Sequence, residues 1–181
     1  MSALLPWGGQ AARAAAPAQA PESGEAVARE IKAAYLYKFA SYVEWPGTAF
    51  AGPDSPVVIG VAGDEPLRRV LARMVVDKTA GGRRLAVRRV QPGDALAGVH
   101  ILFVGQADGR EPADVLQATR GRPVLVVSDS GRVRSLGSMI NFVNVGQRLR
   151  FEVALGPVAQ SGLKVSALML SAAYQVARED F

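Results

Sequence analysis

The chain has 181 residues, a formal net charge of +5 and no cysteine. With 49% hydrophobic residues it can bury one substantial core, and it is too short for two domains of ordinary size. The lack of cysteine excludes disulfides, thiol catalysis and thiolate metal sites. No apolar run reaches the roughly 18 uninterrupted residues of a membrane-spanning helix, so we expect a water-soluble domain.

The basic residues, almost all arginine, are scattered and lack interleaved aromatic side chains. This pattern favours a solvated arginine-rich surface over a nucleic-acid site, and we expect no nucleic-acid partner. Attraction to anionic membrane headgroups stays open.

The first 24 residues predict a targeting segment or a disordered leader that is not part of the fold. They are rich in Ala, Pro and Gly, and Ala12-Arg13-Ala14 has the small-x-small form that signal peptidase prefers. A charged start and a full apolar segment are missing before this point, so either the true start lies upstream or the segment is a leader. We favour export, with residues 25–181 forming a single α/β domain.

Apolar residues at helical spacing predict a long first helix over Glu25–Val43. Trp45-Pro46-Gly47 ends it, because a residue that precedes proline is pushed out of the helical region. The apolar positions form two neighbouring stripes, Ile31, Ala34, Tyr35 and Tyr42 on one and Leu36, Phe39 and Val43 on the other.

The middle of the chain alternates strands with helices. The β-branched run Val57–Ala62 predicts a strand, and Glu65–Val76 predicts the helix that follows it. Arginines around Leu85–Val90 indicate an edge strand. The continuous apolar runs His100–Gly105 and Pro123–Ser128 predict central strands covered on both faces.

The last third predicts a short helix, a hairpin and a closing helix. Ala113–Thr119 fits the short helix, Met139–Val143 and Arg148–Val153 form the hairpin, and Val165–Val176 forms the closing helix. Together the elements predict an α/β fold: a three-layer sandwich with a mainly parallel central sheet, a C-terminal β-hairpin, and helices on both faces.

Groups that could carry catalysis are sparse. The turn at Gly60–Glu65 lacks the glycine spacing and the Lys-Ser/Thr pair of a phosphate loop, and Asp64 and Glu65 are better interpreted as helix caps. His100 is the only histidine, and we expect its ring to bond the backbone at a strand end. We therefore predict no catalytic residues, no metal and no cofactor.

The segment Ser128-Asp129-Ser130-Gly131 follows a central strand at its carboxyl end, where open α/β sheets bind ligands. The alternative is an Asx turn in which Asp129 bonds its own backbone. As a ligand-loop hypothesis we group Asp64, Ser128, Asp129 and Asn141.

Five aromatic residues crowd the end of the first helix, more than one amphipathic stripe can bury. A partner surface is one interpretation, and core packing is the other. The candidate partner-binding residues are Tyr35, Phe39, Tyr42 and Trp45.

Seven short motifs, in this order and spacing, resemble the successive signatures of the YfiR family over roughly Glu25 to Ala177. They are Lys32-Ala33-Ala34-Tyr35-Leu36-Tyr37-Lys38-Phe39, Val43-Glu44-Trp45-Pro46, Gly60-Val61-x-Gly63-Asp64, His100-Ile101-Leu102-Phe103, Pro123-Val124-Leu125-x-Val127-Ser128-Asp129, Met139-Ile140-Asn141-Phe142 and Gly162-Leu163-Lys164-Val165-Ser166.

The resemblance implies a periplasmic, dimeric, non-enzymatic regulator that binds the periplasmic part of an inner-membrane diguanylate cyclase and represses it, lowering cyclic-di-GMP and biofilm formation. Similar domains are fused to membrane sensor proteins, so a small-ligand sensor module acting on another membrane signalling protein is the alternative. Some relatives are redox-sensitive through cysteines. This chain has none, which excludes thiol switching here.

Overall fold

The computed structural model describes residues 20–105 and 112–178, and these form a mixed α/β fold with a central, mostly parallel sheet. The elements in chain order are α1 (Ala20–Tyr42), β1 (Val43–Glu44), the 3-10 turn η1 (Gly47–Ala49), β2 (Val57–Ala62), α2 (Glu65–Met74), β3 (Thr79–Ala80), β4 (Arg83–Arg89), β5 (Ile101–Val104), α3 (Pro112–Gln117), β6 (Leu125–Ser128), α4 (Gly131–Arg134), β7 (Ile140–Val145), β8 (Arg148–Ala154), α5 (Leu155–Gln160), β9 (Lys164–Val165), α6 (Ala167–Ala172) and β10 (Gln175–Ala177).

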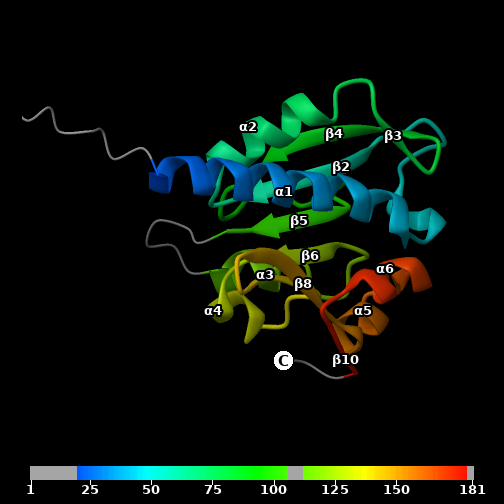
Figure 1. Cartoon of the computed structure of the whole chain (residues 1–181). Coiled ribbons are helices and arrows are strands. Elements are labelled where there is room, and N and C mark those ends of the chain that lie inside the picture. Colours follow the sequence, from blue (N-terminus) through cyan, green and yellow to red (C-terminus); the bar gives the residue numbers. More distant parts are fainter. Residues whose placement is uncertain (1–19, 106–111, 179–181) are drawn as a thin grey trace, which may run out of the picture.

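The main sheet has eight strands in the order β10-β8-β7-β6-β5-β2-β4-β3. The five strands from β4 to β7 run parallel, as strand-helix alternation predicts. The β7–β8 hairpin is antiparallel, and its two-residue loop begins at Gly146, whose φ of 61° suits a tight hairpin turn. Figure 1 shows α1 lying across the sheet beside α2.

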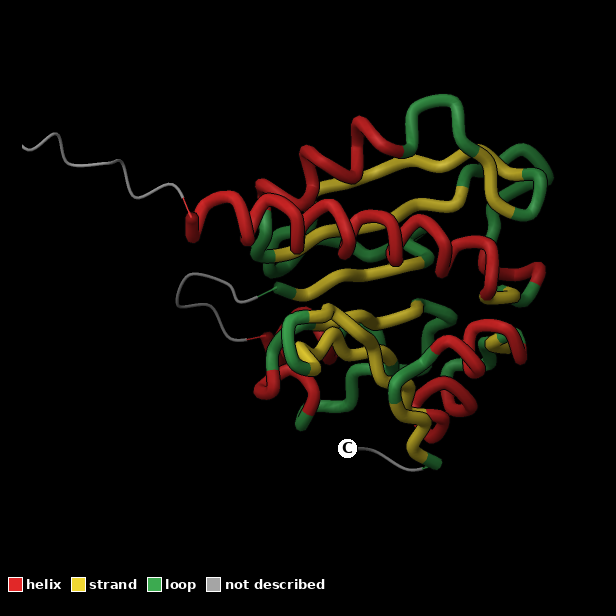
Figure 2. Tube along the Cα trace, in the orientation of Figure 1, coloured by secondary structure: helices red, strands yellow, loops and turns green. Residues whose placement is uncertain are grey.

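Two apolar clusters, one on each face of the sheet, confirm the three layers. Leu36 of α1, Leu67 of α2 and Met169 of α6 pack with the side chains on one face. Val115 of α3 and Val133 of α4 pack on the other. Every residue of β5 and β6 is buried, which explains why these strands read as continuous apolar runs. Figure 2 shows the helices on both sides of the strands.

The C-terminal segment differs from the prediction. The expected helix Val165–Val176 is wrong at both ends: Val165 pairs with Val43 in a small separate sheet, and α6 stops at Ala172. Residues Gln175–Ala177 instead extend the main sheet as β10, parallel to β8. Helical spacing describes the short α6 correctly, but pairing with β8 is a long-range contact that overrides local preference after it.

Among the described residues, no helix combines the length and the apolar character needed to cross a membrane.

Candidate functional site

The two apolar stripes of α1 have different environments. Leu36, Phe39 and Val43 are buried against the sheet. The other stripe faces outward, because Ile31 is 38% exposed and Val27, one turn earlier, is 55% exposed. Helical periodicity therefore predicts both apolar stripes, but only one of them is buried in the core.

Tyr35 and Tyr42 are half-buried and lie where the outward stripe of α1 meets the core. The Tyr35 ring packs against Phe142 and Phe151 of the hairpin at centroid distances of 5.8 and 5.2 Å. The aromatic surplus of α1 thus ties the helix to β7 and β8, and part of each tyrosine stays accessible.

Phe39, a predicted contact residue, is a core residue in this chain. It is buried, it stacks on Tyr35 at 5.9 Å, and it meets Phe151 edge-on at 5.1 Å. A partner that docks on the surface described here does not reach its ring. Phe39 acts on the outer face only by supporting Tyr35 from inside.

Trp45 anchors the segment that follows α1. Its indole Nε1–H donates to the backbone oxygen of His100 at 3.2 Å, and the two rings meet edge-on. Its side chain is half-buried, so the predicted partner role applies only to the part of the ring that remains exposed.

His100 has the structural role that the sequence predicts. Its Nδ1 accepts from the Val58 N–H at 3.1 Å, so the proton sits on Nε2, which lies 3.2 Å from the Ala49 oxygen. Phe50 stacks on the ring at 4.4 Å. Burial lowers the pKa of His100 below its ordinary value, since the site provides little solvation for the charged form.

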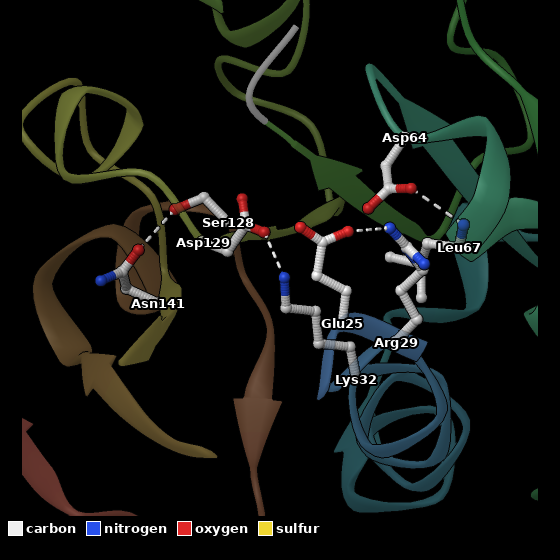
Figure 3. Close-up of polar contacts among 8 residues, drawn as sticks. All are labelled: Glu25, Arg29, Lys32, Asp64, Leu67, Ser128, Asp129 and Asn141. Carbon is white, nitrogen blue, oxygen red and sulfur yellow. Dashed lines mark hydrogen bonds and ion pairs between the residues drawn. The ribbon is translucent and has the colours of Figure 1, made fainter. Parts of the chain in front are cut away.

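At the carboxyl edge of the sheet, Asp129 pairs with α1. The Lys32 Nζ donates to Asp129 Oδ2 at 2.5 Å, and the two side chains are only 16% and 17% exposed. Oδ1 of Asp129 is buried with no hydrogen-bond partner among the described residues. Figure 3 shows this ion pair bridging the helix and the loop after β6. The carboxylate thus reaches across to α1, a contact that the Asx-turn alternative does not include.

Asp64 caps α2, as the sequence predicts. Its Oδ1 accepts from the Leu67 N–H at 2.9 Å. A hydrogen bond from Arg68 is the main cause that lowers the pKa of the neighbouring Glu65 to about 2. Gly105, at the end of β5, leaves space for this turn: a Cβ there would lie 3.2 Å from the Asp64 Cβ.

Ser128 and Asn141 form a separate pair on the opposite face of the sheet. Val127 belongs to the cluster beneath α1, so the neighbouring Ser128 faces the other way. Its hydroxyl donates to Asn141 Oδ1 at 2.8 Å inside the protein. The four ligand-loop residues therefore do not converge on one point (Figure 3), and a ligand role for them stays a prediction.

Sequence reasoning missed Lys32, although a signal was present. Lys32 lies four residues before Leu36 and seven before Phe39, which places it on the buried stripe of α1. A cation at such a position requires a carboxylate partner. Val27 was also missed, because periodicity does not tell which of two apolar stripes faces the sheet.

The described residues contain no cluster of three or more His, Asp or Glu side chains that could hold a metal ion. Asp64 caps α2, Lys32 pairs with Asp129, and Ser128 bonds Asn141, and these three contacts are structural.

The YfiR/HmsC-like family model matches residues 29–174, which include the larger part of α1, every strand of the main sheet except β10, and α6. The match spans most of the chain and agrees with the motif resemblance. The chain belongs to the YfiR/HmsC-like family.

Proposed function

We propose that this protein is a periplasmic repressor that binds the periplasmic part of an inner-membrane diguanylate cyclase and holds it inactive. Family membership carries the proposal, because the family suggests a periplasmic regulator of diguanylate cyclase signalling and is regulatory and non-enzymatic. A regulator of this kind needs a rigid scaffold and a contact surface, and it requires no nucleophile or general base.

The outward stripe of α1 is the contact surface that we propose. It joins two exposed aliphatic side chains, Val27 and Ile31, to the accessible parts of Tyr35 and Tyr42. Amphipathic helices with an unburied apolar stripe are a common way to present a docking face. The helix is long, and its inner stripe is fixed to the sheet by Leu36, so the outer face is held rigidly.

Repression across the membrane requires the domain to bind the inactive cyclase more tightly than the active one. A ligand that binds two states with equal affinity does not shift the equilibrium between them. Moving the cyclase from almost fully active to almost fully inactive takes a differential affinity of about 10⁴-fold.

The experiment that tests the surface is charge insertion on α1. Burying an aliphatic side chain contributes about 1.5–3 kcal/mol, so Ile31→Asp is expected to weaken binding at least tenfold. Adding Val27→Asp to this variant should weaken binding further. Co-purification with a membrane diguanylate cyclase of the same organism measures binding, and cellular cyclic-di-GMP measures repression.

Leu136→Asp is the matched control, because Leu136 is equally apolar, exposed, and follows α4 on the opposite face of the sheet. It should leave binding unchanged. If Ile31→Asp and Leu136→Asp both retain full binding and repression while the wild type represses, the contact lies elsewhere.

A further inference from the structure

The net positive charge of the chain resides in one short segment. Residues 64–89 contain eight Lys and Arg against three Asp and Glu, an excess of five. The other residues contain 13 of each kind, so their net charge is zero. The basic residues are therefore more concentrated than the scattered pattern we inferred from the sequence.

This segment forms one end of the molecule. It comprises α2, β3 and β4, which lie at the end of the strand order opposite β10 (Figure 1). Three of its arginines make contacts within the protein. Arg68 bonds Glu65, Arg83 contacts the Phe50 ring and backbone oxygens, and Arg88 bonds the Ala95 oxygen.

The remaining five cations of the segment are exposed. These residues, which we call the basic end, are Arg69, Arg73, Lys78, Arg84 and Arg89. Arg69 and Arg73 stand one turn apart on the outer side of α2, and Lys78 follows the helix. In the described part of the chain, only Arg69 of the five has an ion pair, with Glu65.

An exposed apolar side chain stands close in the chain to these cations. Val76 is 62% exposed, and it follows α2 between Arg73 and Lys78, with the exposed Asp77 beside it. An exposed aliphatic residue within a segment of net positive charge is typical of surfaces that bind the headgroup region of anionic bilayers.

We propose that the basic end binds the surface of an anionic phospholipid bilayer, with its cations against headgroup phosphates and Val76 at the depth of the glycerol backbone. Each cation near such a surface contributes about 1 kcal/mol, or roughly fivefold in affinity. Five exposed cations therefore suffice for reversible adsorption at low salt.

The local composition favours a lipid surface over other anionic partners. Residues 64–89 contain no Phe, Tyr or Trp, so they offer neither the stacking groups of single-strand nucleic-acid sites nor the aromatic anchors of protein interfaces. None of the five cations lines the cavities beside Arg120, Asp114 and Arg122.

This inference goes beyond the proposed function and does not depend on it. A protein that regulates a membrane enzyme from the periplasm works next to a bilayer, and adsorption would restrict its search to two dimensions. Binding to lipid vesicles needs no cyclase, so failure of one proposal is distinguishable from failure of the other.

The test is sedimentation of the full chain with vesicles of phosphatidylcholine, with and without phosphatidylglycerol. We expect binding only with phosphatidylglycerol, and we expect it to be lost near 0.5 M salt, where exposed charges are screened. The triple variant Arg73→Glu, Lys78→Glu and Arg84→Glu should bind at least about 100-fold more weakly.

The matched control is Arg120→Glu, Arg122→Glu and Arg148→Glu, which changes the net charge equally at exposed positions outside the basic end. It should keep most of the binding. A glutamine triple at positions 73, 78 and 84, checked by thermal unfolding, replaces the glutamate triple if that variant does not fold.

Three results would overturn the proposal. One is equal loss in both triples, which would mean that net charge alone acts. Another is binding to phosphatidylcholine alone with unchanged affinity. The third is no binding to vesicles that contain phosphatidylglycerol; binding to soluble polyglutamate that depends on the basic end would then assign this surface to an acidic protein.

Discussion

At the scale of single residues, His100 organises the amino end of the sheet. Its ring accepts from Val58, contacts the Ala49 oxygen, and lies between Phe50 and Trp45. This arrangement requires a neutral imidazole, because a proton on Nδ1 would face the Val58 N–H. The residue that could have suggested acid–base chemistry is instead committed to packing.

Because burial holds the His100 pKa below its unfolded value, its contribution to stability is complete above the unfolded pKa of about 6.5 and declines as the pH falls through the folded pKa. We therefore expect the free energy of unfolding to decrease as the pH falls below about 6.5. Urea unfolding at several pH values measures it.

His100→Asn keeps an acceptor near the position of Nδ1 and cannot titrate. It should be less stable at pH 8 by about 1–2 kcal/mol, since it loses ring packing, yet show a flatter pH dependence. His100 is the only histidine, so no other side chain of that type contributes in this range. A variant that retains the wild-type slope would show that another group titrates.

At the scale of elements, the Lys32–Asp129 pair fixes α1 to the carboxyl end of β6. The contact is mostly buried, and Lys32 shares the helix face of Leu36 and Phe39. The pair therefore sets how the inner face of α1 seats on the sheet, and with it the orientation of the outer stripe that we propose as the docking surface.

A double-mutant cycle tests this link. Lys32→Met leaves Asp129 without its cation and should cost about 2 kcal/mol of unfolding free energy, as should Asp129→Asn. The double variant should cost clearly less than the sum, with a coupling of about 1 kcal/mol or more. Strictly additive losses, measured by urea unfolding, would mean that the pair contributes no coupling.

The sequence predicts the elements whose evidence is local. The strands β2, β5 and β6 follow from β-branched or continuous apolar runs, and the cap of α2 follows from Asp64. The outer side of β4 pairs only with the two-residue β3, which agrees with the arginine-based expectation of an edge. In each case the deciding interactions lie within a few residues.

Elements that depend on distant partners were not predictable. The β1–β9 pairing joins Val43 to Val165, and β10 exists because Gln175–Ala177 meet β8. The candidate site residues also differ in whether local sequence or long-range packing decides their contacts. The Asp64 cap is local, whereas the Asp129 partner and the burial of Phe39 depend on how α1 packs.

At the scale of the whole molecule, we propose separate tasks for two surfaces. The outward stripe of α1 is proposed to hold the cyclase, and the basic end is proposed to hold the bilayer. The stripe lies on α1, and Arg69 and Arg73 of the basic end lie on α2, which packs beside α1 (Figure 1). One orientation of the domain can therefore present both to a membrane enzyme. The homodimer that the resemblance implies stays a prediction.

Reconstitution tests whether the domain represses the cyclase by direct contact. The measurement is cyclic-di-GMP synthesis by the purified membrane cyclase in proteoliposomes, with the domain added on the side of the cyclase's periplasmic part. We expect a saturable fall in synthesis with the wild-type domain and with Leu136→Asp, and little fall with Ile31→Asp. Unchanged synthesis at domain concentrations that saturate binding would contradict it.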